Sequence, residues 1–329
     1  MYTGRVFLSF RSLKQAAWLV LLTCPAVACA QDSTSHPAAV AAPADTGTAA
    51  QKPSAEAAGS GTDKTDSSAS ESVIIPPLPS VDTAAALKEG EKLRAAFRSA
   101  VGSSAVKLTP ARQALMIRLA KEQLQSSDHK IDRAQLIVIV DRSPAIQRLA
   151  LVLALPDQDD WPLIGASKTS TGTAGRKYYY ITPTGIFENS ADRLGYRAEG
   201  TKNKNGIRGI GAKGMRVWDF GWHNATKGWS GNGKTGDIRL EMHATDPDFL
   251  ESRLGRPASE GCVRIPARVN VFFDQHGVLD AEYEQTASYD ARFRALLPKN
   301  LTPTPVTGDL MVVVDSTGLS AASGYKGKS

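Results

Sequence analysis

The chain has 329 residues, of which 42% are hydrophobic and 22% are charged, and this composition excludes a multi-span membrane protein. The net charge of +6 is unevenly spread: residues 1–30 carry +3, residues 31–80 carry −4, and residues 81–329 carry the remaining +7. This last surplus is compatible with an anionic polymer, surface or substrate and selects none of them.

The first thirty residues predict an export signal. A basic start is followed by the apolar run 16–22 and by small residues at 28–30, which is the pattern of a secretory signal peptide cleaved before Gln31. A membrane anchor is the alternative, but the apolar run is much shorter than the roughly 20 residues of a spanning helix. Lipidation at Cys29 is a third option. We therefore expect an exported, periplasmic protein, with lipidation as an open alternative.

Residues 31–80 form a predicted linker. They are dominated by Ala, Ser, Thr, Pro, Gly and Asp, and Val40 is the single large apolar residue between Gln31 and Ser72. Such a segment buries too little surface to offset chain entropy, so we expect disorder. It would act as a spacer, or have no role of its own.

A helical segment is predicted over residues 81–130. Residues 84–101 and 109–124 are rich in helix-forming residues, and residues 102–104 separate them. Thr109, followed by a proline, supplies an N-terminal cap for the second helix. We expect a role in packing or positioning.

From residue 135 the hydrophobic pattern takes the period of β-strands. The predicted strands cover residues 135–140, 149–153, 178–181, 185–187, 238–242 and 310–314. They indicate a mainly β domain with few helices over residues 135–317, followed by a flexible tail at 318–329.

The strand at 238–242 places a histidine on a surface. Its alternation turns Ile238, Leu240 and Met242 inward, so Glu241 and His243 lie on the opposite face, together with Arg239. His243 follows at the end of this strand.

A cysteine close to a tight turn is the second chemical feature. Once the signal is removed, Cys262 is the only thiol, and it is either a buried apolar residue or a nucleophile. Gly261 indicates a tight turn, and a helix from Pro266 to near Gly277 would lower the thiol pKa with its N-terminal partial charge. His243 is the candidate base, and the turn amides could stabilise an oxyanion.

These residues resemble the catalytic domain of the L,D-transpeptidase (YkuD-type) family. His243, fifteen intervening residues, and Ser-Glu-Gly-Cys-Val-Arg at 259–264 match the family pattern except at Glu260, where the family commonly has histidine. Upstream, residues 170–172 and 182–187 resemble the family's second conserved segment. The resemblance implies a β-sandwich-like fold with a few helices.

The resemblance also implies roles for individual residues. Cys262 would be the nucleophile, His243 the base, and the backbone carbonyl of Ala244 the group that orients the imidazole. The amides of Gly261 and Cys262 would form the oxyanion hole. Arg264 would bind a substrate carboxylate or hold its loop together.

Further substrate-binding candidates are Ser259, Trp218 and Trp222. The two tryptophans belong to a glycine-rich stretch at 188–237, where aromatic and basic side chains suit a sugar-peptide polymer; packing in the core is the alternative. A formal G-x-G-x-x-G at 209–214 lacks the strand and helix of a dinucleotide site.

The implied function is a peptidoglycan L,D-transpeptidase that acts in cell-wall organisation and cell shape. Cys262 would form an acyl-enzyme with a stem peptide and pass it to an amine acceptor, such as a second stem or a protein. We expect no cofactor, no metal ion and no nucleic acid. Alternatives are an L,D-carboxypeptidase, with water as acceptor, and a non-catalytic wall-binding module. Glu260 is expected not to be the general base.

Overall fold

The computed structural model describes residues 75–320, which belong to one compact unit. The predicted export signal and all but the end of the predicted linker lie outside the described residues. Helices make up 25% and strands 26% of the structure, a sheet-rich fold with few helices that agrees with the mainly β prediction. Within residues 75–320, no helix has the length and apolar character needed to span a bilayer.

The first five-stranded sheet has the order β3-β2-β1-β10-β5. Its only parallel pair is β1 with β10, which brings the last strand beside the first. The strands are β1 (Gln135–Asp141), β2 (Arg148–Ala154), β3 (Leu163–Lys168), β5 (Gly185–Glu188) and β10 (Leu310–Val314).

The second sheet has the order β4-β7-β8-β9, with β6 also paired to β7. Strands β7 and β8 form a long antiparallel pair, and β8 continues into a parallel pairing with the short β9. The strands are β4 (Tyr180–Ile181), β6 (Tyr196–Arg197), β7 (Arg216–Lys227), β8 (Thr235–Ala244) and β9 (Val263–Ile265).

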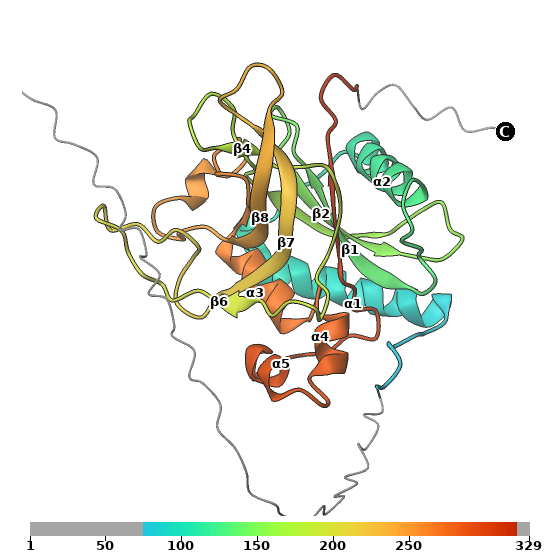
Figure 1. Ribbon diagram of the computed structural model, residues 1–329. Coiled ribbons are helices and arrows are strands. Elements are labelled where there is room, and N and C mark those ends of the chain that lie inside the picture. The colour runs from blue at the N-terminus through green and yellow to red at the C-terminus, as the bar shows by residue number, and fades with distance from the viewer. Residues whose placement is uncertain (1–74, 321–329) are drawn as a thin grey trace, which may run out of the picture. The chain divides into compact units, whose positions relative to one another are not determined.

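The main core lies between the two sheets and includes two helices, α1 (Thr83–Val101) and α3 (Ala267–Gln275). Phe97 of α1 meets Phe272 of α3 edge to face, with 5.1 Å between ring centroids. The Phe97 ring also lies against Gly165 of β3, where any Cβ would come within 2.2 Å of it. Helix α1 is therefore part of the main core (Figure 1).

Helix α2 (Pro110–Gln125) covers the other face of the first sheet. Thr109 caps it, its hydroxyl accepting a hydrogen bond from the Arg112 N–H at 3.2 Å, as the sequence predicts. Met116 and Ala120 of this helix are completely buried in the second core cluster. The remaining helical segments are η1 (Gly102–Ser104), η2 (Glu251–Arg253), α4 (Ala281–Thr286) and α5 (Ala291–Leu296).

All six predicted strands are present, although the one predicted at 178–181 is shortened to β4. The inward positions of the β8 alternation are also confirmed, because Ile238, Leu240 and Met242 are buried. The prediction that His243 lies on a surface is wrong, because it is only 3% exposed. The prediction for residues 188–237 was incomplete. This stretch contains β7, twelve residues long and central to the second sheet, and its glycines concealed the strand pattern.

Candidate active site

The pairing of β8 with β9 brings the candidate nucleophile and base together. His243 is in register with Arg264, and Met242 with Val263, so Cys262 lies beside Glu241 at the start of β9. Because alternate residues of a strand share a face, Glu241 and His243 face the same side as Cys262 and Arg264. Cys262 and His243 are thus diagonal neighbours on one face of the sheet. No hydrogen bond joins their side chains in the described part of the chain.

The His243 imidazole is held in one tautomer. Its Nδ1 lies 2.7 Å from the backbone oxygen of Ala244, which can only accept, so Nδ1 carries the proton and Nε2 is a free acceptor. The side chain is only 3% exposed. Burial lowers the pKa of His243 to about 4, and the positive charge of Arg264 also lowers it. The hydrogen bond to Ala244 raises this pKa, but by less than burial lowers it. His243 is therefore a neutral base at pH 7.

The Cys262 thiol is protonated at rest. Burial raises its pKa to about 11, and the negative charge of Glu241 adds to this effect. The backbone N–H of Glu241 and the charge of Arg264 act in the opposite direction. The predicted lowering of the thiol pKa by a helix N-terminus is wrong, because β9 separates Cys262 from the start of α3 at Ala267. The thiol therefore needs a base to react at neutral pH.

The turn before Cys262 is held by Ser259. Its buried hydroxyl donates to the Cys262 carbonyl oxygen at 2.6 Å and accepts from the Gly261 N–H at 3.2 Å. Ser259 is therefore a turn residue, and its prediction as a substrate contact is wrong. The Gly261 amide, predicted for the oxyanion hole, is occupied by the same hydroxyl.

The turn before Cys262 requires glycine at position 261. Its φ of +146° lies in the region that favours glycine, and a Cβ there would come within 2.8 Å of Ile238 Cδ1. The turn thus depends on backbone that only glycine adopts without strain.

Thr182 connects this turn to the upstream segment. Its buried hydroxyl accepts from the Gly172 N–H at 2.8 Å and donates to the Gly261 carbonyl oxygen at 2.6 Å. Arg142 donates in turn to the Thr182 carbonyl oxygen. The two sequence motifs at 170–172 and 182–187 therefore meet at the turn. The motif spacing gave a signal for Thr182 but did not reveal this contact.

The side chain of Glu260 is exposed and forms no ion pair within the described residues. Its backbone oxygen accepts from the Tyr180 N–H at 3.0 Å, which ties the turn to β4. The charge of Glu260 has a smaller effect on the Cys262 pKa than that of Glu241. Glu260 therefore does not take the place of His243 beside the thiol.

The tryptophan candidates have different outcomes. Trp218 is completely buried, and its indole N–H donates to Asp280 at 3.2 Å, so its prediction as a substrate contact is wrong. Trp222 is 71% exposed, so it remains a predicted substrate contact. Trp229 packs edge to face on Tyr180, with ring centroids 5.1 Å apart.

Sequence reasoning missed a polar group beside the thiol. Tyr196 donates to Glu241 Oε1 at 3.0 Å, and Arg239, which forms an ion pair with Asp219, lies 4.0 Å from the same oxygen. Burial raises the pKa of Glu241. Strand alternation placed Glu241 on the His243 face, but its position beside Cys262 follows only from the β8–β9 pairing.

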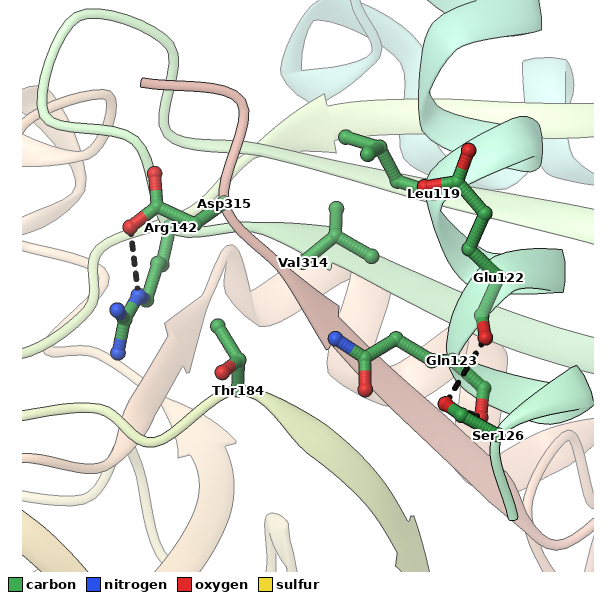
Figure 2. A pocket seen from close by; sticks show the side chains of 8 residues that line it. All are labelled: Leu119, Glu122, Gln123, Ser126, Arg142, Thr184, Val314 and Asp315. Carbon is green, nitrogen blue, oxygen red and sulfur yellow. Dashed lines mark hydrogen bonds and ion pairs between the residues drawn. The ribbon is translucent and has the colours of Figure 1, made fainter. Parts of the chain in front are cut away.

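A cavity of about 370 Å³ lies away from these residues, between α2 and the ends of β1 and β10. Figure 2 shows its polar wall, in which Arg142 pairs with Asp315 at 2.9 Å, and Glu122 and Gln123 project from α2. None of the candidate catalytic residues lines it. Within residues 75–320, no group of three or more His, Cys, Asp or Glu side chains is arranged to hold a metal ion.

The chain matches no protein-family model, and no curated protein matches it. Any assignment of function therefore rests on the residue pattern and on the geometry of the Cys262 face.

Proposed function

We propose that the protein is a cysteine-dependent acyltransferase, specifically a peptidoglycan L,D-transpeptidase with the β-sandwich-like fold of that family. The observation that carries this proposal is the His243–Cys262 pair. The two side chains share one sheet face, and the Ala244 carbonyl holds the imidazole with Nε2 unprotonated. A nucleophile, a base and a group that orients the base are the three parts that covalent acyl transfer requires.

In the proposed acylation, Nε2 of His243 takes the thiol proton while Sγ of Cys262 attacks the carbonyl carbon between an L-centre and a terminal D-residue. The carbonyl electron pair moves to oxygen and forms a tetrahedral intermediate. Its collapse breaks the C–N bond, and the leaving amine takes the proton from His243. A thioester and a free D-amino acid result.

The oxyanion donor follows from the turn. The Gly261 N–H already donates to Ser259, so the Cys262 N–H is the donor we assign to the developing oxyanion. An amine acceptor then attacks the thioester and passes a proton to His243. The C–S bond breaks, and the Cys262 thiolate leaves and takes that proton from His243. With water as the acceptor, the same residues perform L,D-carboxypeptidase chemistry.

The proposed location is the periplasm, where the substrate would be found. This part of the proposal rests on the basic, apolar and small-residue pattern of residues 1–30. The net charge of +7 over residues 81–329 supports a wall polymer that bears carboxylates.

Incubation of the protein with disaccharide-tetrapeptide, followed by mass spectrometry, tests the proposal. A crosslinked dimer would support transfer, and a tripeptide would support hydrolysis. An intact-mass measurement after exposure to a carbapenem should show one adduct, which Cys262→Ala and His243→Ala abolish. Glu260→Gln is the matched control and should retain the adduct. Absence of any adduct or product with the unaltered protein would favour a non-catalytic wall-binding module.

A further inference from the structure

A carboxyl group beside Cys262 has no part in the acylation step. Glu241 is level with Cys262 across the β8–β9 pairing, whereas His243 lies two residues further along β8. The Glu241 side chain is 13% exposed, so it is not sealed from solvent. Its charge hinders the first half of the proposed reaction, because a neighbouring negative charge raises the thiol pKa. A negative charge at this place would help the second half, in which an amine attacks the acyl-enzyme.

Tyr196 holds the Glu241 carboxylate in place. Its hydroxyl donates to Oε1 at 3.0 Å. Burial and the charge of Glu241 raise the pKa of Tyr196, so the hydroxyl stays protonated and remains a donor. The charge of Cys262 also acts on the Tyr196 pKa, which groups the phenol, the carboxylate and the thiol. Within residues 75–320, Oε2 of Glu241 accepts no hydrogen bond, so one oxygen is fixed and the other is available to a ligand.

The charges around Glu241 are not balanced. Arg239 donates two hydrogen bonds to Asp219 and lies 4.0 Å from Glu241 Oε1, so one arginine serves two carboxylates. Among the charges that act on the Glu241 pKa within residues 75–320, Arg239 is the one cation and Asp219 is the other acid. With both acids ionised, the group is short of one positive charge. A primary ammonium group supplies that charge together with three N–H donors.

The position of Glu241 fits an incoming amine. Glu241 and Cys262 are level on strands that lie about 4.8 Å apart. A nitrogen hydrogen-bonded to the carboxylate at about 2.9 Å can therefore lie about 3–3.5 Å from a thioester carbon on Sγ, which is a near-attack distance. Burial raises the pKa of Glu241, which makes its carboxylate a better proton acceptor than an exposed one.

We infer that Glu241, held by Tyr196, binds the acceptor of the second half-reaction as a primary ammonium group. The bound ammonium gives one proton to the Glu241 carboxylate, and the freed lone pair attacks the thioester carbon. The nitrogen gives a second proton to His243, the C–S bond breaks, and the Cys262 thiolate takes that proton from His243. Glu241 returns its proton to the solvent. This inference rests on the proposed function for the reaction, and it adds the residue that selects an amine over water.

The partition of the acyl-enzyme between amine and water tests the inference. The full chain is acylated by disaccharide-tetrapeptide at neutral pH with Nα-acetyl-L-lysine methylamide present, and mass spectrometry gives the ratio of amide product to hydrolysed tripeptide. Glu241→Gln should lower this ratio about tenfold. Tyr196→Phe should lower it less, because the carboxylate remains and loses only its hydrogen bond. Glu260→Gln is the matched control and should keep the ratio, because it removes the same charge from an exposed side chain next to Cys262.

An uncharged acceptor separates recognition of the ammonium from general damage to the site. Hydroxylamine is largely uncharged at neutral pH, and its attack on the thioester gives a hydroxamate. The loss in Glu241→Gln should therefore be much smaller with hydroxylamine than with the lysine acceptor. An equal loss with both acceptors, or an unchanged ratio with the lysine acceptor, would overturn the inference. A raised ratio would also overturn it, because Glu241 would then activate water.

A binding measurement keeps the inference apart from the proposed function. Cys262→Ala protein is titrated by NMR with Nα-acetyl-L-lysine methylamide and with its Nε-acetylated form, which lacks the charge. Binding of the charged form alone, lost when Glu241→Gln is added and kept when Glu260→Gln is added, supports the ammonium site even where no donor acylates Cys262. Only the proposed function would then fail. Equal binding of the two forms refutes Glu241 as an ammonium site.

Discussion

The electrostatics of the thiol can be tested with a single substitution, Glu241→Gln. Glu241 lies beside Cys262 across the β8–β9 pairing, and its negative charge is the second-largest cause, after burial, of the raised thiol pKa. The side chain is 13% exposed, so solvent screens it weakly. Glutamine removes the charge and retains an oxygen that accepts from Tyr196.

The magnitude follows from Coulomb's law. Two unit charges about 6 Å apart, at an effective dielectric constant of roughly 20 to 40, interact by about 1.4 to 2.8 kcal/mol, which is one to two pKa units. We therefore expect the Cys262 pKa to fall from about 11 to about 9 or 10. It should stay above the ordinary thiol value of about 8.5, because burial is unchanged. The thiolate fraction at pH 8 should rise at least about tenfold.

The pH dependence of Cys262 alkylation by iodoacetamide, resolved by peptide mass spectrometry, measures this pKa. Glu260→Gln removes the same charge one residue from Cys262, but Glu260 is exposed and has the weaker effect. Its shift should therefore be smaller. Equal shifts in the two variants, or a pKa near the ordinary value in the unaltered protein, would refute the assigned burial and geometry.

Three other substitutions follow from the same contacts. Gly261→Ala forces a Cβ against Ile238 at a φ of +146°, so carbapenem adduct formation should fall and thermal unfolding should show a loss of about 1–3 kcal/mol. Thr182→Val removes a hydroxyl that bonds two backbone groups of the turn and should slow acylation of Cys262. Thr184→Val, at an exposed position, should leave the acylation rate unchanged. Equal rates in the two variants would contradict the role of Thr182 in the turn. Burial raises the pKa of Glu284 to about 8. The folded protein therefore keeps its full stability below about pH 4, where the Glu284 carboxyl is protonated, and loses stability as the pH rises through 8. Glu284→Gln should raise the melting temperature at pH 9 and leave it nearly unchanged at pH 4, as measured by calorimetry.

The periodic parts of the fold could be predicted from the sequence. The strand at 135–140 has a continuous apolar run, and the helix at 109–124 has an apolar repeat and a recognisable cap. In both, the local pattern and the tertiary structure agree. Strand β7 could not be identified, because Gly221 and polar residues interrupt its pattern and its stability comes from pairing with β6 and β8. Trp218 was misplaced for the same reason: without β7, its burial had no visible cause.

The sequence predicted that His243 and Cys262 come together, and it did not predict the electrostatics of the pair. The residue types and spacing of His243 and Cys262 indicated a nucleophile and a base, and both lie on one face. The pKa shifts depend on burial and on Glu241 and Arg264, which only the three-dimensional pairing reveals. Ser259 illustrates the same limit, because a hydroxyl beside a nucleophile has the same sequence signal whether it binds substrate or closes a turn.

The separation of the two pKa values has a consequence for the order of events. With the thiol pKa raised to about 11 and the imidazole pKa lowered to about 4, moving the proton from Cys262 to His243 at rest is unfavourable. In the proposed reaction, the proton transfer therefore accompanies attack on a bound substrate. Arg264 favours the thiolate but repels the imidazolium. A carboxylate bound to Arg264 would offset that repulsion, so His243 would accept the proton more readily only when a charged donor is in place. Replacing the donor carboxylate by a carboxamide should then lower kcat for acylation as well as raise KM, whereas a site that only binds the carboxylate would change KM alone.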